Sequence, residues 1–263
     1  MKTPVIALAL LALLAACTRP NEEPEQAPPL ATDAFPANQF LGFFNPLPVD
    51  SDSYATAYYA AVDPGNDRDT FAKWRDANGF VGGAAVTNVV FLDTHDLGYG
   101  RNMSMRRTAL GGVAVYVENY RVPVFAGQSY AEINLEAAVG RTRRYLAGIN
   151  AIEWGPQDAD ANGAADDLNG DGAINAADFI TRFYSYGPDG TRQLSVDMDG
   201  KGRKGMPTTC ISCHGGRQYP LLPDGSFAAP DGGFVPAGGR LPTVRGDTRA
   251  RLQALNLDSL VYP

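Results

Sequence analysis

Residues 112–125 read GVAVYVENYRVPVF, and the segment VAVYVENY within them sets the expected fold. Its period-two alternation predicts a β-strand that is closely followed by a second strand. Two further apolar runs, TNVVFLD at 87–93 and LAGINAIEW at 146–154, are separated from it by turn residues. The sequence therefore predicts a β-rich region over residues 38–156.

Short helices are expected to accompany these strands. The segment DRDTFAKWRDANGF at 67–80 predicts a helix that places Phe71 and Trp74 on one side and ends at Gly79. The chain contains 29 Gly and 19 Pro, which favours turns and short strands over a helical bundle. Its formal net charge of −7 argues against nucleic acid as a partner, because nucleic-acid binding needs basic patches.

The N-terminus has the features of an export signal. Residues 1–16 hold an apolar run that is too short to cross a bilayer as a permanent helix, which predicts a cleaved signal peptide. The sequence LAAC, ending at Cys17, resembles the lipobox of bacterial lipoproteins and implies that Cys17 is lipidated; an ordinary secretory signal is the alternative. Residues 17–37 are rich in Pro and Glu and predict an extended tether. We therefore expect a lipid-anchored protein of the bacterial cell envelope, on the periplasmic face of the outer membrane, with no other attachment to the membrane.

Two cysteines and a histidine are clustered in TTCISCHGGR at 208–217. A dithiol redox pair usually opens a helix of a βαβ unit, whereas here two glycines follow at once. Structural zinc takes four ligands, and Cys210, Cys213 and His214 supply at most three. The spacing C-x-x-C-H is the signature of haem c attachment, with two thioether bonds to the haem and the adjacent histidine as an iron ligand. The sequence therefore predicts covalent haem c at these three residues, with zinc and a redox dithiol as the alternatives.

The second axial ligand of the haem iron has to come from upstream, because no Met or His follows His214. The segment HDLGYGRNMSM at 95–105 follows a strand-like run, and its glycines Gly98 and Gly100 would let the backbone approach a flat cofactor. The side chains able to serve are Met103, which is preferred, His95 and Met105; Met198 and Met206 are nearer to the motif in sequence and less favoured. An open sixth position is the alternative.

The segment 158–178 carries the acidic spacing of a calcium loop. From Asp167 it follows D-x-N-x-D-G-x-I-N-x-x-D, a twelve-residue loop with Gly172 at the sharp turn. The expected calcium ligands are Asp167, Asn169, Asp171, the carbonyl of Ala173, Asn175 and Asp178. A weaker overlapping set consists of Asp158, Asp160, Asn162 and Asp166. The following residues FITRFYSY, 179–186, are expected to form a short helix. A solvated acidic loop without metal is the alternative.

Because its last ligand is Asp rather than Glu, the loop is more similar to those of dockerin modules than to calmodulin-like switches. The combination of DLGYGRNM at 96–103 with DMDGKGRKGMPTTCISCHGG at 197–216 resembles a group of uncharacterised bacterial secreted or lipid-anchored proteins with a single c-type haem motif. The resemblance implies a cytochrome c-like protein and leaves Met103 as the residue that matches the relatives' pattern. It implies no known substrate.

Together these features predict the α+β class: a β-rich N-terminal part with short helices, a calcium-binding loop and helix over 157–186, and a coil-rich c-type haem-binding part over 187–263. The expected function is electron transfer to or from a redox partner protein in the cell envelope, with calcium in a structural role. One alternative is a haem enzyme or gas-binding sensor with an open or displaceable distal position. The other is an interaction module built on the dockerin-like loop.

Overall fold

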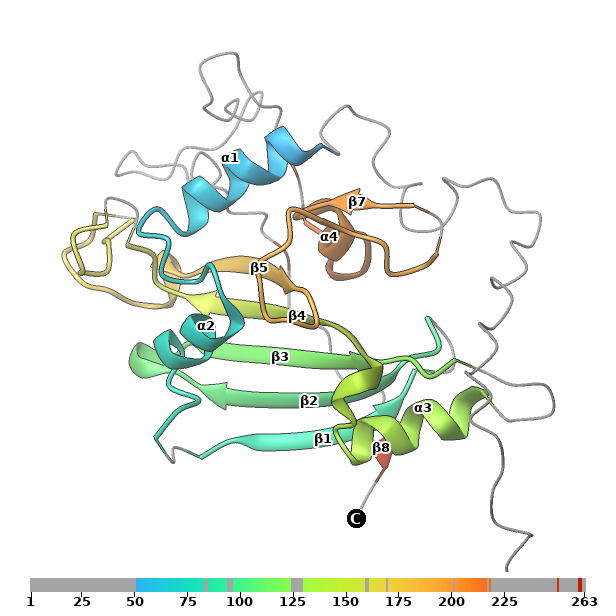
Figure 1. Cartoon of the computed structure of the whole chain (residues 1–263). Helices are drawn as coiled ribbons and strands as arrows, with labels where there is room; N and C mark the ends of the chain where they lie inside the picture. The colour runs from blue at the N-terminus through green and yellow to red at the C-terminus, as the bar shows by residue number, and fades with distance from the viewer. Residues whose placement is uncertain are drawn as a thin grey trace, which may run out of the picture. The chain divides into compact units, whose positions relative to one another are not determined.

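An antiparallel sheet with strand order β5-β4-β3-β2-β1-β8 forms the centre of the computed structural model (Figure 1). The structure describes residues 51–82, 85–93, 97–123, 130–158, 161–168, 170–200, 202–216, 218, 250 and 260–261. The strands of the sheet are β1 (Thr87–Leu92), β2 (Gly100–Arg107), β3 (Val113–Tyr120), β4 (Leu146–Gly155), β5 (Ile180–Tyr186) and the short β8 (Leu260–Val261). A separate two-stranded sheet pairs β6 (Ser195–Val196) with β7 (Lys204–Gly205).

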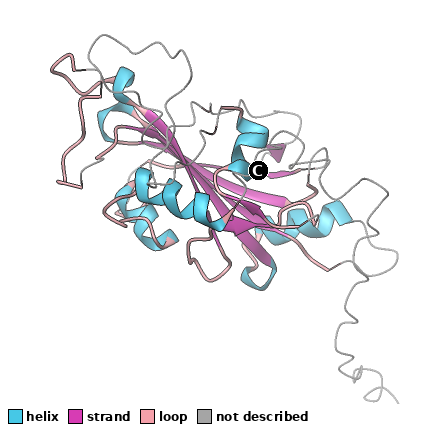
Figure 2. Cartoon of the chain, turned by 90° about the horizontal axis from the view of Figure 1, so that it is seen from above, coloured by secondary structure: helices cyan, strands magenta, loops and turns pink. Residues whose placement is uncertain are grey.

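Helices lie on both sides of the strands (Figure 2). They are α1 (Asp52–Val62), α2 (Phe71–Ala77), α3 (Tyr130–Val139) and α4 (Thr208–His214), with short 3-10 turns η1 (Ala109–Gly111), η2 (Arg143–Tyr145) and η3 (Ala176–Asp178). Side chains cap the first two helices, because Ser51 accepts a hydrogen bond from the Tyr54 backbone N–H and Thr70 accepts one from that of Lys73.

The strand register defines two faces of the sheet. Paired residues of an antiparallel sheet point to the same side, and successive residues point to opposite sides. Face A carries the row Ser104–Tyr116–Ala151–Tyr184, and face B carries the adjacent row Met103–Val117–Asn150–Ser185. The position of any other side chain on these strands follows from its distance along the strand to one of these two rows.

Face A is covered by an aromatic core. The Tyr116 ring on β3 meets three rings of the α2 region edge-on, at centroid distances of 5.0 Å to Phe71, 6.1 Å to Trp74 and 5.1 Å to Phe80. Trp74 is fully buried. Such pairs contribute about 0.5–1.5 kcal/mol each beyond the burial of their area. The helix predicted over 67–80 thus forms as α2 and packs on the sheet through the two aromatic residues that the sequence indicated.

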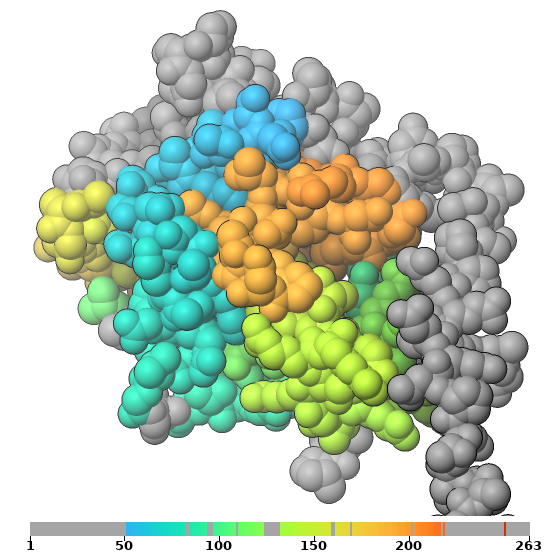
Figure 3. All heavy atoms as spheres, viewed as in Figure 1, coloured from blue at the N-terminus to red at the C-terminus, as the bar shows by residue number. Residues whose placement is uncertain are grey.

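Helix α1 closes the outer edge of β5, the last strand of the sheet. The Tyr58 hydroxyl donates to the Phe183 carbonyl at 3.3 Å and accepts from the Phe183 N–H at 2.7 Å. The Tyr59 hydroxyl accepts from the Ser185 N–H at 3.4 Å and donates to the Gln193 carbonyl. In the space-filling view α1 also packs against the segment that contains β6, β7 and α4 (Figure 3). The two tyrosines therefore take the place of a neighbouring strand along most of this edge, while residues 192–193 pair with its end.

Gly100 lets α3 approach the sheet. A Cβ atom at this position would lie 1.8 Å from the Asn134 carbonyl oxygen of α3, so no larger residue fits without a shift of the helix. The Asn134 side chain secures the contact, because it donates to the Gly98 carbonyl and accepts from the Val122 N–H. The close approach expected at Gly100 therefore occurs, but its partner is a helix of the same chain rather than a cofactor.

The predicted fold class is wrong. Residues 180–186, expected to be helical, form β5 and pair with β4 along their whole length. All of them are buried, and a run that is buried on both faces shows no spacing that separates strand from helix. The expected coil-rich haem-binding part is also not seen: residues 187–216 contain the β6–β7 pair and α4, and nearly all of 219–263 lies outside the described residues. The described part is a mixed fold of one large antiparallel sheet with helices.

Candidate functional site

Helix α4 carries the cysteine–histidine cluster. It begins after Pro207 and ends at Gly215, whose φ of +67° is a left-handed conformation that favours glycine at a helix end. Cys210, Cys213 and His214 are spaced i, i+3 and i+4, so they lie on one side of the helix. Cys213 is exposed, Cys210 and His214 are half-buried, and both cysteines are thiols. Two thiols and an imidazole are thus presented together from one short helix.

The Cys210 thiol faces the protein interior. Its sulfur lies 4.0 Å from the sulfur of the fully buried Met206. Burial raises the pKa of the Cys210 thiol well above its ordinary value, and the nearby Cys213 raises it further. Since redox dithiols and zinc ligands act as thiolates, this environment opposes both of those chemistries. A thioether, which is neutral, suits the same environment.

His214 lies over strand β5. Its ring is 5.5 Å from the Phe183 ring, centroid to centroid, with an angle of 47° between the planes. Phe183 is fully buried and lies two residues from Ser185, hence on face B. Helix α4 therefore packs at the β5 side of face B.

The predicted distal ligands are spread over face B. Met103 lies on β2 in the row that continues through Val117 to Asn150, and it is 8% exposed. Met105 lies two residues further along β2 and is half-buried. Met206 packs beside Cys210, as described above. His95 lies outside the described residues. The structure thus brings Met103 to the same face as His214, with two strands between the strand of Met103 and the strand under His214.

The sulfur of Met198 contacts α4, because it accepts a hydrogen bond from a hydroxyl group of that helix. Its Sδ accepts hydrogen bonds from Asn150 Nδ2 at 3.5 Å and from Thr209 Oγ1 at 3.7 Å. Its carbonyl accepts from the Tyr99 hydroxyl at 2.9 Å. Sequence reasoning ranked this residue low, and no signal in the sequence places it on face B, because its position depends on the loop between β6 and β7.

The predicted calcium loop has its carboxylates turned toward its own backbone. Asp167 accepts from the N–H groups of Gly170, Asp171 and Gly172, and Asp171 accepts from that of Ala173. Each carboxylate oxygen keeps lone pairs beyond these bonds. Gly172, at the predicted sharp turn, has a φ of +89°. Asn169 lies outside the described residues, so the complete ligand set is not seen.

Asp178 closes the loop from its far end. It is fully buried, its Oδ1 accepts from the Leu168 N–H at 2.9 Å, and its Oδ2 accepts from the Asn175 N–H at 2.8 Å. The Asn175 side chain in turn accepts from the Ala177 N–H, and Asn175 and Asp178 together form a capping box on η3. These contacts join the loop directly to the start of β5.

The weaker acidic set repeats the same local contacts nine positions earlier. Asp158 accepts from the N–H groups of Asn162 and Gly163, and Asn162 accepts from that of Ala164. Gly163 has a φ of +88°, matching Gly172. Asp160 lies outside the described residues. Within the part of the chain that the structure describes, no group of three acidic, histidine or cysteine side chains is assembled around a common point.

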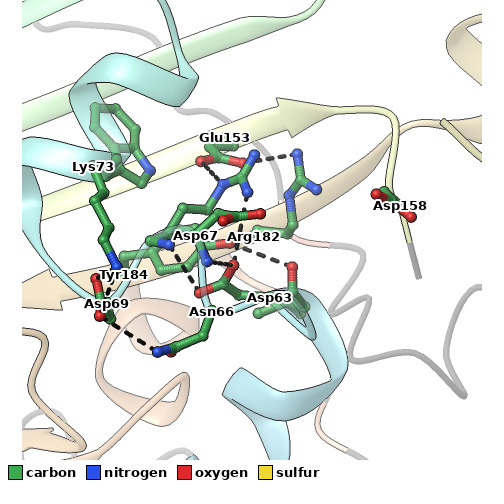
Figure 4. Close-up of polar contacts among 12 residues, drawn as sticks. Asp63, Asn66, Asp67, Asp69, Lys73, Glu153, Asp158, Arg182 and Tyr184 are labelled. Atoms are coloured by element: carbon green, nitrogen blue, oxygen red, sulfur yellow. Dashed lines mark hydrogen bonds and ion pairs between the residues drawn. The ribbon is translucent and has the colours of Figure 1, made fainter. Parts of the chain in front are cut away.

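A buried ionic network is centred on Glu153 (Figure 4). Glu153 on β4 accepts from Arg68 Nε at 2.8 Å and Asn78 Nδ2 at 2.6 Å, and its other oxygen is 2.7 Å from Arg182 Nη2. Burial alone would raise the Glu153 pKa, but the charges of Arg182 and Arg68 outweigh it and hold that pKa below its ordinary value. Sequence reasoning missed this network, although Glu153 is the one charged residue of strand β4.

A polar pocket of about 360 Å³ opens beside this network, and it is lined by residues that include Arg68, Arg182, Gln157 and Asp158. None of its lining residues belongs to α4. The pocket and the cysteine–histidine helix are therefore separate features of the molecule.

No family model, curated protein or solved structure matches this chain. Cys17 and the rest of residues 1–50 lie outside the described residues. Among the residues described, no helix has the length and apolar character needed to cross a membrane. The functional argument accordingly depends on the chemistry of α4 and of the acidic loop.

Proposed function

We propose that the protein is a mono-haem c-type electron-transfer protein of the bacterial cell envelope, anchored by a lipid on Cys17 and stabilised by calcium. The observation that carries the proposal is the arrangement of Cys210, Cys213 and His214 on one side of α4, next to the buried ring of Phe183. The proposed partner is another redox protein of the envelope.

The residues of α4 fit covalent haem. Each thiol would add across one vinyl C=C bond of the haem, with sulfur bonding to one carbon and the thiol hydrogen going to the other. The half-buried Cys210 would thereby become a neutral thioether, which its apolar surroundings favour over a thiolate. His214 would bind the iron, and the bound haem would supply one-electron redox chemistry.

The sheet supports this helix rigidly. Phe183, against which His214 packs, belongs to a strand bonded on one side to β4 and on the other to the Tyr58 hydroxyl. Rigid surroundings keep an iron ligand in a constant orientation, which suits a protein that changes oxidation state without changing shape. This supports electron transfer over a function that requires large movements at the haem.

The acidic loop supports the calcium part of the proposal. Asp167 and Asp171 would supply carboxylate oxygens at spacings typical of a calcium loop, and the backbone already makes the required turn at Gly172. Because Asp178 ties the loop to β5, bound calcium would stabilise the strand beneath α4. Its role is therefore structural.

The haem proposal is tested by expressing the chain together with a c-type haem maturation system. The wild type and a Ser212→Ala control, altered on the same helix, are expected to keep a haem signal through denaturing electrophoresis. The double variant Cys210→Ala, Cys213→Ala is expected to lose it. A wild-type protein without covalent haem would refute the proposal, and a reduced haem that binds CO readily would favour the gas sensor or haem enzyme over electron transfer.

The calcium proposal is tested by thermal unfolding with and without calcium. A ligand present at 100 times its Kd stabilises the folded state by about 2.7 kcal/mol, so the wild-type Tm should rise clearly. Asp167→Ala should abolish the rise, and Asp76→Ala, at an exposed position on α2, should preserve it. An equal rise in both variants would contradict a site in this loop.

A further inference from the structure

The sulfur of Met198 is held by polar groups on two sides. Asn150 Nδ2 donates to it from β4 and Thr209 Oγ1 donates to it from α4, one residue before Cys210. The Asn150 amide is itself fixed, since its Oδ1 accepts from the Ser185 hydroxyl at 3.1 Å. A methionine that only fills space needs no such donors, because a thioether is a weak acceptor that packs well in apolar surroundings. The contacts therefore fix the sulfur at one place above face B.

The strand position beneath that sulfur is nearer to the position under His214 than the strand positions of Met103 and Met105 are. Asn150, which the sulfur contacts, pairs with Ser185 on β5, and Ser185 lies two residues from Phe183, under the His214 ring. One strand spacing and two residues of rise separate Asn150 from Phe183, about 8 Å between backbones. Met105 shares the row of Phe183 but lies three strands away, about 14 Å, and Met103 lies farther still.

Met206 is unsuited for a different reason. Its sulfur lies 4.0 Å from the Cys210 sulfur, which the proposed function assigns to the haem edge. An axial ligand has to reach the iron at the centre of the ring from the face opposite His214. Met206 is fully buried beside the attachment point, so it would have to leave the core to do so.

We infer that Met198 is the second axial ligand of the haem iron, an inference that rests on the proposed function. Met103, the candidate preferred from sequence, is then a packing residue of face B. Asn150 acts as a positioning residue: a thioether sulfur has two lone pairs, so one can bind iron while the other keeps the hydrogen bond from Asn150 Nδ2. The weaker contact from Thr209 would be given up to the metal.

The position of Met198 is also fixed by a hydrogen bond to its backbone carbonyl. The Tyr99 hydroxyl holds the Met198 carbonyl, and Tyr99 is 5% exposed at the entrance to β2. The segment 96–103, which carries the sequence resemblance, therefore contributes to the distal side through Tyr99. This contact explains how that segment can matter for the haem without donating a ligand itself.

The test compares Met198→Ala with Met103→Ala in the full chain with haem attached. Met198→Ala is expected to convert the ferric haem from low spin to high spin and to let the ferrous haem bind CO, whereas Met103→Ala should leave both properties as in the wild type. Met198→His should restore a low-spin haem with a lower reduction potential, since imidazole donates more strongly to iron than thioether does. Asn150→Leu should keep the haem low spin but lower its potential, because the sulfur loses a hydrogen bond that withdraws electron density.

Covalent haem content, measured on the same samples, distinguishes a failure of haem attachment from a failure of Met198 as the iron ligand. If covalent haem forms and Met198→Ala remains low spin without CO binding, or if Met103→Ala is the variant that opens the site, the assignment of Met198 is wrong while the proposed function stands. If covalent haem forms and the wild type already binds CO, the assignment of Met198 is wrong and the electron-transfer part of the proposed function fails with it, while covalent haem attachment stands. If no covalent haem forms in the wild type, the proposed function itself fails.

Discussion

The hydroxyl of Tyr58 is expected to be one of the most important single polar groups for the stability of this fold. It is 1% exposed and makes two hydrogen bonds to the backbone of Phe183, at 2.7 Å and 3.3 Å. Tyr58→Phe would leave the Phe183 N–H and carbonyl unpaired in the interior. An unsatisfied buried group costs about 1–3 kcal/mol, so we expect a loss of about 3 kcal/mol for the pair.

The assay is denaturant unfolding of the purified protein, followed by far-UV circular dichroism and fluorescence. Tyr145→Phe serves as the control, because that half-buried tyrosine makes no side-chain hydrogen bond within the described part of the chain; its ring packs against the core and lies beneath the guanidinium of Arg144. The midpoint of unfolding should fall for Tyr58→Phe and stay nearly constant for Tyr145→Phe, with an unchanged m-value. A loss below about 1 kcal/mol for Tyr58→Phe would refute the argument, since it would mean that water or another group satisfies the edge of β5.

Three further predictions concern the packing of α3 and the buried ionic network. Gly100→Ala places a methyl 1.8 Å from the Asn134 carbonyl and should destabilise the fold by about 1–3 kcal/mol or more, while Gly155→Ala, whose nearest neighbour would be at 3.9 Å, should be tolerated; equal unfolding midpoints would contradict this. Glu153→Gln leaves the buried Arg182 without its counter-charge and removes one of the two carboxylates beside the half-buried Arg68, so it should cost about 3–5 kcal/mol in chemical denaturation; a cost below about 1 kcal/mol would show that water compensates for the lost charge. Because folding lowers the pKa of Glu153, its ionised carboxylate stabilises the fold at neutral pH, and this stabilisation is lost progressively as the pH falls below about 4.3, the ordinary pKa of a glutamate. In thermal unfolding between about pH 5 and pH 3, the wild type should therefore lose more stability than Glu153→Gln does.

The sequence predicted the strand and the helix that bury only one side, because the spacing of their apolar residues then shows the period of the element. Alternation in VAVYVENY predicted β3, and the spacing of Phe71 and Trp74 predicted α2. Strand β5 was mistaken for a helix because FITRFYSY is buried on both faces and shows no decisive period. Its content of aromatic and β-branched residues was the signal that favoured a strand.

The candidate site could be predicted from the sequence only for those reactive residues that are neighbours along the chain. Cys210, Cys213 and His214 are neighbours along the chain, so their presentation on one helix follows from their spacing. The placement of Met198 beside α4 depends on contacts with residues 48 positions upstream at Asn150 and 99 positions upstream at Tyr99. Contacts of that range follow from strand register and loop path, which single-residue patterns do not encode.

Strand β5 links the two proposed sites. Asp178, the last residue of the acidic loop, lies two residues before Ile180, at the start of the strand, and Phe183 within the strand contacts His214. A cation in the loop would hold the beginning of β5, while α1 holds its free edge through Tyr58. The support beneath the proposed haem helix therefore comes from segments that precede the motif in the sequence, namely α1 and the stretch from the acidic loop through β5. For this reason a fragment limited to α4 and its flanking residues would keep the attachment motif but lose the surface that orients His214.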